Sequence, residues 1–161
     1  MFSSDEKAVI GQPIYLLIVA VVSVVIIAIF LITLYTTTIE SQRYTVEHEI
    51  DKILSQAMTM YDYADEGTFI TIHVDFPSTM RFIVFGGLPQ NGTEQPTNLS
   101  LNTSMTNNYY YVMVDGTIHA GHTTVCFSAQ NTSQLALFRS GSYYLNLELV
   151  REGEMTYVKV Y

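Results

Sequence analysis

The chain has 161 residues, enough for about one domain, and 7 Lys and Arg against 15 Asp and Glu give a formal net charge of −8. This acidic balance argues against nucleic acid as the main partner, because phosphate binding is driven by clustered cations. A hydrophobic fraction of 48% excludes a disordered chain, and a single cysteine excludes both a disulfide framework and a multi-cysteine zinc site within one chain.

The first predicted element is an apolar helix over residues 14–35. These 22 residues contain no charge, and Ser23 and Thr33 are the only clearly polar residues among them. At about 1.5 Å per residue the segment is roughly 33 Å long, which is enough to cross a bilayer core of about 30 Å. Tyr15 and Tyr35 lie at its ends, where amphipathic rings favour the membrane interface. A buried core helix rarely has this length without a polar face, so we expect a membrane-embedded segment.

A cleaved secretory signal peptide is the main alternative interpretation of this segment. Such a signal has a basic start, an apolar core of about 7 to 15 residues and a small-residue cleavage site. Here residues 1–7 are net acidic, the apolar run is longer, and no small-x-small site follows it. We therefore expect the segment to be retained.

The orientation of the segment is predicted from glycosylation triplets rather than from charge. Lys7 precedes the segment while Arg43 and Lys52 follow it, so the positive-inside rule gives no clear answer. The region downstream holds four N-glycosylation acceptor triplets, which begin at Asn91, Asn98, Asn102 and Asn131. We therefore expect the C-terminal part to be extracytoplasmic, with these four asparagines as candidate glycosylation sites.

The helix is predicted to continue beyond the membrane as an amphipathic helix. One stripe of apolar residues shares a helical face: Ile39, Val46, Ile50, Ile53, Ala57, Tyr61 and Ala64. Gly67 follows the last of them and is the predicted stop signal. Residues 36–38 are three threonines, and β-branched residues are poorer helix formers outside a membrane, so a bend is most expected there.

From Thr68 onward the apolar period changes to two, which is typical of strands. The clearest candidates are residues 68–76, 80–85, 109–114, 117–119, 143–150 and 155–161, with shorter ones at 123–127 and 135–138. Residues 88–108 are rich in Asn, Thr, Ser, Pro and Gly and are predicted to form a long exposed loop, while Asp115-Gly116 is a strong hairpin signal. Six to eight mostly hairpin-linked strands predict an antiparallel β-sandwich or barrel, and the whole chain is therefore of the α+β class.

The best constellation for metal chemistry is His119-x-x-His122-x-x-x-Cys126, with Asp115 and His73 as additions. Residues three apart on a strand face opposite sides, and Gly121 favours a turn at His122. We therefore expect no metal site, and interpret the set as one strand histidine, one loop histidine and a small buried thiol.

The sequence holds no nucleophile elbow, phosphate loop or dinucleotide fingerprint, and its carboxylate pairs lie where solvated charges are common. We therefore predict that the chain is not an enzyme, with no catalytic residues and no cofactor. Two tyrosine clusters, at residues 109–111 and 143–144, either pack within strands or form an outer contact surface.

An apolar N-terminal helix, its amphipathic continuation and a C-terminal β domain together resemble the type IV pilin superfamily. Asp5-Glu6-Lys7-Ala8, followed by Val9 and the apolar run, resembles the class III signal of archaeal prepilins and archaellins. The resemblance implies cleavage between Ala8 and Val9 by a prepilin peptidase, with Lys7, Ala8 and Val9 as the processing residues. It also implies a leader over 1–8, a pilin-like helix over 9–66 with its span at 14–35, and an extracytoplasmic β domain over 67–161.

Two departures from bacterial pilins narrow the resemblance. Gln12-Pro13 stands where those proteins carry a glutamate near the start of the mature helix, and the chain lacks their cysteine pair. Together with the glycosylation triplets, these departures favour an archaeal member. The β domain is larger than major archaeal pilins require, which favours a minor or pilin-like subunit.

The resemblance implies a structural subunit of a surface filament. Its partner would be the membrane before assembly, and copies of itself or other pilin subunits after assembly. Before assembly the N-terminus would be cytoplasmic and the β domain extracytoplasmic. One alternative is a single-span protein that never polymerises, similar to archaellum stator subunits. The other is a membrane-anchored metal or redox domain built on His119, His122 and Cys126.

Overall fold

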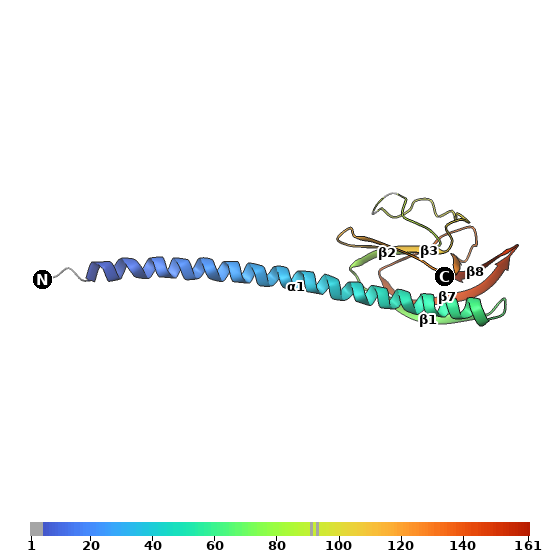
Figure 1. Cartoon of the computed structure of the whole chain (residues 1–161), viewed down its shortest axis with the longest axis horizontal. Helices are drawn as coiled ribbons and strands as arrows, with labels where there is room; N and C mark the ends of the chain where they lie inside the picture. Colours follow the sequence, from blue (N-terminus) through green and yellow to red (C-terminus); the bar gives the residue numbers. More distant parts are fainter. Residues whose placement is uncertain (1–4, 91, 93) are drawn as a thin grey trace. The chain divides into compact units, whose positions relative to one another are not determined.

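The structure, a computed structural model, describes residues 5–90, 92 and 94–161, with side chains from residue 14 onward except residue 39. Within these residues one helix, α1 (Asp5–Tyr63), is followed by eight strands (Figure 1). The strands are β1 (Phe69–Phe76), β2 (Met80–Phe85), β3 (Asn108–Met113), β4 (Ile118–His122), β5 (Cys126–Ser128), β6 (Ala136–Arg139), β7 (Gly141–Glu152) and β8 (Met155–Val160). The predicted α+β class with a sandwich-like β domain is confirmed.

The helix is continuous through the threonine run, where a bend was most expected. It begins at Asp5, inside the predicted leader, and ends at Tyr63, one residue before the predicted end. Gly67, with φ of 85°, follows in the turn, so the glycine stop signal is confirmed within a few residues. The chain forms two compact units, Met1–Ser41 and Gln42–Tyr161. The C-terminal part of the helix, residues 42–63, therefore belongs with the strands rather than with the apolar segment.

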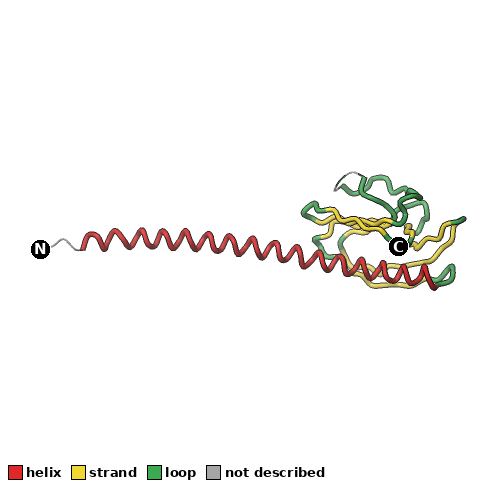
Figure 2. Tube along the Cα trace, viewed as in Figure 1, coloured by secondary structure: helices red, strands yellow, loops and turns green. Residues whose placement is uncertain are grey.

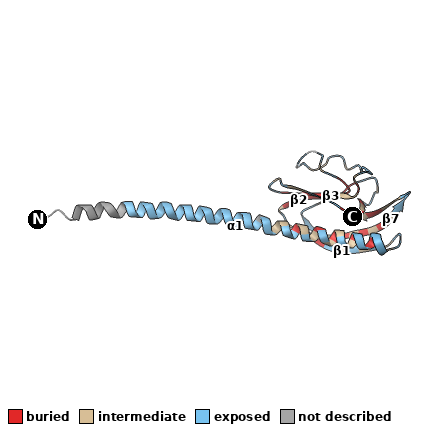
Figure 3. Ribbon diagram, in the orientation of Figure 1, coloured by how far each residue is buried: buried red, intermediate tan, exposed pale blue. Residues whose placement is uncertain are grey.

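The helix from Gln42 onward buries one stripe against the sheets (Figure 3). Val46, Ile50, Ile53 and Ala57 are all nearly inaccessible to solvent, as their spacing predicts. The next member of the stripe is Met60, which is 1% exposed, whereas the predicted Tyr61 is 37% exposed. The prediction of Tyr61 was wrong because the position three residues after Ala57, rather than four, faces the core here.

The strands form two four-stranded sheets (Figure 2). The first sheet has the order β1-β7-β8-β5 and the second the order β4-β3-β2-β6. Inward residues of both sheets, among them Val74, Phe85, Phe127 and Val158, form one core with the helix stripe. The Asp115-Gly116 hairpin between β3 and β4 is confirmed, since Gly116 has φ of 87° and the Thr117 N–H donates to Asp115 Oδ1 at 2.9 Å.

One strand pairing departs from the predicted antiparallel arrangement. The β5 and β8 strands pair in parallel, with Phe127 opposite Val158, so the sheets are not purely antiparallel. The chain also crosses from one sheet to the other after β1, because β1 and β2 belong to different sheets. A strand of three residues such as β5 carries no alternation that indicates its partner.

Side chains of the helix bond to the β1 edge of the first sheet. Within β1 the His73 carbonyl accepts a hydrogen bond from Lys52 Nζ at 3.1 Å, and the Asp75 N–H donates to Glu49 Oε2 at 3.2 Å. Lys52 and Glu49 also pair with each other at 2.7 Å. An uncovered edge invites pairing with another strand, and these helix side chains occupy two of its backbone groups.

The loop after β2 is more structured than predicted. It begins at Gly86, where φ is 91° and an added Cβ would lie 2.7 Å from the Phe127 carbonyl oxygen, so glycine is required for close approach. Leu101 of this loop packs with Leu135, from the segment before β6, against the outward side of the second sheet. The residues they contact there are Phe82, Val84, Tyr110 and Val112. Residues 88–108 were predicted to form an exposed loop, but Thr106 is only 2% exposed, so part of the loop is buried.

Candidate functional site

The candidate functional surface is the apolar segment of α1, residues 14–38, in which every described residue is exposed (Figure 3). Eighteen large apolar side chains between Ile14 and Tyr35 are each between 44% and 68% exposed. They leave no polar face on this segment. By length and composition, the part of α1 over Ile14–Tyr63 is long and apolar enough to cross a membrane.

The serine and threonine hydroxyl groups in this segment are already hydrogen-bonded within the helix. Ser23 Oγ donates to the Val19 carbonyl at 2.8 Å, and Thr33 Oγ1 donates to the Ile29 carbonyl at 2.9 Å. The three threonines at 36–38 do the same one turn back, at 2.8 to 3.0 Å. An unbonded hydroxyl in an apolar environment would cost several kcal/mol, and this bonding removes most of that cost. The surface that suits apolar surroundings therefore extends past Tyr35 to Thr38.

The predicted processing residues Lys7, Ala8 and Val9 fall within the bounds of α1. Their side chains lie outside the part of the chain that the structure describes, and residues 1–4 of the leader are outside it altogether. Cleavage between Ala8 and Val9 stays a prediction.

The C-terminal part of α1, residues 42–63, is held to the second sheet by a polar contact that the sequence did not indicate. Tyr111 on β3, only 4% exposed, donates from its hydroxyl to Glu47 Oε1 at 3.1 Å. Glu47 also pairs with Arg43, with 3.4 Å between Arg43 Nε and Glu47 Oε1. The ring of His119 stacks on the ring of Tyr111, with 4.8 Å between the two centroids. Glu47 is itself partly exposed on the helix, whereas its partner Tyr111 is buried.

Alkaline pH is expected to destabilise this arrangement. Burial first, and then the charge and hydrogen bond of Glu47, raise the pKa of Tyr111 well above its usual range, and burial also raises the pKa of Tyr109, Tyr110, Tyr157 and Tyr161. The native state then holds these protons more tightly than the unfolded state. The stability they contribute is complete below the unfolded pKa of about 10 and is lost as the pH rises above it.

The test is the urea midpoint of the full chain in detergent, measured by pulse proteolysis between pH 8 and pH 11. The wild-type midpoint should fall steadily above about pH 10. Tyr111→Phe should show a shallower fall, because it has lost the most strongly shifted proton. Superimposable curves for the two proteins would contradict the role given to Tyr111.

The predicted metal constellation is split between the sheets. His119 and His122 both lie on β4 in the second sheet, while Cys126 on β5 and His73 on β1 belong to the first. His122 is therefore a strand residue, not a turn residue as predicted, and its ring is bonded to Asn107 and Asn108. Gly121 has another role, since an added Cβ would collide with the Tyr109 ring. Among the described residues no group of three His, Cys, Asp or Glu side chains is placed to hold a metal ion.

The two tyrosine clusters contain buried packing residues as well as an exposed ring. Tyr110 and Tyr111 are buried at 2% and 4% exposure and belong to the packing of the second sheet. Tyr144 is 76% exposed on the outward side of β7, with its ring 4.9 Å from that of His73.

The described glycosylation triplets all lie on loops with exposed asparagines. Asn98 and Asn102 are in the loop between β2 and β3, and Asn131 is between β5 and β6. Asn91 lies outside the described residues.

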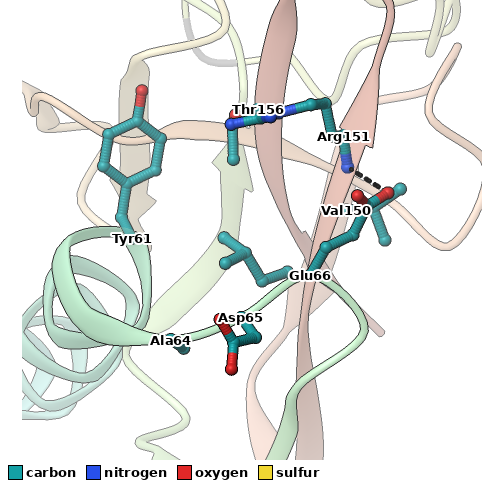
Figure 4. Close-up of a pocket in the computed structure, with 8 residues that line it drawn as sticks. Tyr61, Ala64, Asp65, Glu66, Val150, Arg151 and Thr156 are labelled. Carbon is teal, nitrogen blue, oxygen red and sulfur yellow. Dashed lines mark hydrogen bonds between the residues drawn. The ribbon is translucent and has the colours of Figure 1, made fainter.

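An open pocket of about 400 Å³ lies where the end of the helix meets β7 and β8 (Figure 4). Asp65, Glu66 and Arg151 are among its lining residues. The Arg151 backbone N–H on β7 donates to Glu66 Oε1 at 3.4 Å, which gives Glu66 a structural role in the wall of this pocket.

Comparisons of the chain with models of known protein families, with curated proteins and with solved structures found no match.

Proposed function

We propose that the chain is a structural subunit of an archaeal type IV pilus-like surface filament, assembled through its apolar N-terminal helix with the β domain facing outward for adhesion or surface attachment. The observation that carries the proposal is the apolar surface of residues 14–38, exposed on every side.

This surface requires cover. Completing the burial of eighteen half-exposed large apolar side chains is worth on the order of 20 kcal/mol, at about 1 kcal/mol for the remaining half of each. That exceeds the whole stability of a typical domain, which is about 5–15 kcal/mol. A lipid bilayer, or the helices of other subunits, would supply the cover.

The pattern of side chains favours many neighbours over one. Helix pairs in membranes usually meet along a stripe of small residues four apart. Here the small residues Ala20, Ser23 and Ala28 are not spaced in this way, and β-branched Val and Ile surround them. Such a helix presents similar surfaces in all directions, as a helix in the centre of a filament would.

The length of the uncharged run also supports a filament. No Asp, Glu, Lys or Arg occurs over residues 8–39. At about 1.5 Å per residue this run is roughly 48 Å long, against a bilayer core of about 30 Å. Tilt accommodates part of the excess in a membrane, whereas neighbouring helices in a filament would cover all of it.

The mechanism is an exchange of environments. The helix is first stored in the membrane, where its backbone and hydroxyl groups are satisfied internally. On assembly the same side chains leave lipid and pack against the helices of other copies. Repeated contacts between different surfaces of identical subunits do not close on themselves, and they generate a helical fibre.

The direct test is fractionation of the cells that make the protein. Surface material removed by shearing is sedimented, and an antibody against the β domain measures the chain in this fraction and in the membrane. The proposal expects the chain in sedimentable filaments as well as in the membrane. Recovery only as a detergent-soluble membrane monomer would contradict polymerisation and would favour the single-span alternative that presents a β domain without assembling.

A further inference from the structure

Three of the four glycosylation triplets, those at Asn98, Asn102 and Asn131, come together on one side of the β domain. Ser100 and Gln134 form a β-bridge that joins the loop before β3 to the loop before β6. The Leu101 N–H donates to the Ser133 carbonyl at 2.8 Å, and the Leu135 N–H donates to the Leu99 carbonyl at 2.7 Å. Segments 98–104 and 131–135 are therefore neighbours, and we call the surface that they form the triplet face.

The triplet face is firmly supported from below. Leu101 and Leu135 pack into the apolar cluster on the outward side of the second sheet. Modified asparagines here would stand on an ordered platform rather than on a free tail.

Each described triplet has the same local geometry. The side-chain Oδ1 of the asparagine accepts the backbone N–H of the serine two residues on, at 2.9 Å for Asn98, 3.2 Å for Asn102 and 3.0 Å for Asn131. Their Nδ2 atoms make no hydrogen bond with any residue that the structure describes, and the three side chains are exposed. The nucleophilic atom is thus presented outward beside the hydroxyl residue of its own triplet.

Two asparagines outside the triplets, Asn107 and Asn108, differ in this respect. The Nδ2 of Asn108 donates to the Met105 carbonyl at 3.1 Å, and that of Asn107 contacts His122 Nε2 at 3.4 Å. These amides are used within the fold.

We propose that the triplet face carries N-linked oligosaccharides at Asn98, Asn102 and Asn131, so that one side of the β domain is covered by glycan and protein contacts are made elsewhere. In each transfer, a bond forms between Nδ2 and C1 of a sugar. The bond between that C1 and the phosphate oxygen of a lipid-linked oligosaccharide donor breaks, and the amide proton leaves with the lipid phosphate. This inference rests on the extracytoplasmic position of the β domain in the proposed function.

The consequence is a two-sided β domain. The outward side of the first sheet has no triplet among its described residues and exposes Phe69 and Tyr144, at 65% and 76%. Glycan on the opposite face would leave this side accessible.

The experiment is glycopeptide mass spectrometry of the full chain isolated from the cells that make it, with the same chain from a non-glycosylating bacterium as the mass reference. We expect a sugar mass increment on the peptides of all three asparagines. Each of Asn98→Gln, Asn102→Gln and Asn131→Gln should remove one increment, and Ser100→Ala should remove that of Asn98 while leaving the asparagine in place. Asn146→Gln, on β7 and outside any triplet, is the matched control and should remove none.

Unmodified asparagines at all three positions, or modification of only one, would overturn a glycan-covered face. The wild-type glycopeptides decide this without any variant that fails to fold. Failure is distinguishable from failure of the filament proposal. Glycan-bearing chain that stays monomeric in the membrane would sink the filament alone, and sheared filaments of unmodified chain would sink the glycan face alone.

Discussion

Replacing Ile26 by lysine is expected to abolish filaments while leaving the protein in the membrane. Ile26 lies near the middle of the apolar segment and is 60% exposed in the single chain. In lipid, one lysine at the centre of a span costs about 3 kcal/mol, which the remaining apolar side chains outweigh, and its flexible stem reaches toward the interface. Among the packed helices of a filament, the ammonium group of the lysine cannot reach water in this way.

An unpaired charge buried among protein side chains costs at least about 3 kcal/mol more than a charge that reaches the membrane interface. The amount of chain in the sheared fraction should therefore fall at least about a hundredfold, since about 3 kcal/mol is two powers of ten. The amount in the membrane should change little. Ile26→Leu is the matched control and should assemble as the wild type does. Wild-type filaments formed by the lysine variant would mean that residue 26 is not buried by neighbouring helices.

The second large effect is expected for Phe85→Ala in the β domain. Phe85 is fully buried at the end of β2 and contacts three other rings, with centroids 5.3 Å from Phe127, 6.2 Å from Tyr109 and 6.4 Å from Phe138. Phe127 belongs to the first sheet and the other two to the second, so Phe85 joins the two layers. Truncating such a side chain costs about 3–5 kcal/mol.

The measurement is pulse proteolysis of the full chain in detergent across a urea series. The free energy of unfolding of the β domain should fall by about 3–5 kcal/mol, a large share of a typical total. Tyr144→Ala removes an exposed aromatic ring and should change stability by less than about 0.5 kcal/mol. Equal losses in the two variants would contradict the assignment of Phe85 to the centre of the sandwich.

Elements set by local periodicity were predictable from the sequence. The helix stripe through Val46, Ile50 and Ile53 has the spacing of a helical face, and these residues are buried as expected. The Asp115-Gly116 turn was equally readable, because its backbone requirement is met within four residues.

Features set by contacts between distant segments were not predictable. Tyr111 and Glu47 are separated by 64 residues, and no periodic pattern indicates that one accepts a hydrogen bond from the other. Gly121 was interpreted as favouring a turn, yet it lies within β4, where a Cβ would collide with the ring of Tyr109 on the neighbouring strand. The neighbouring positions of the glycosylation triplets depend on the Ser100 and Gln134 bridge, which joins two irregular loops.

The N-terminal residue of the protein recovered from native membranes or from sheared filaments distinguishes a processed filament subunit from an unprocessed anchor. We expect a mature chain that begins at Val9, and loss of this processing when the prepilin peptidase is absent. An intact Met1 on membrane-retained protein would contradict it. The chain would then be a single-span anchor that presents a β domain.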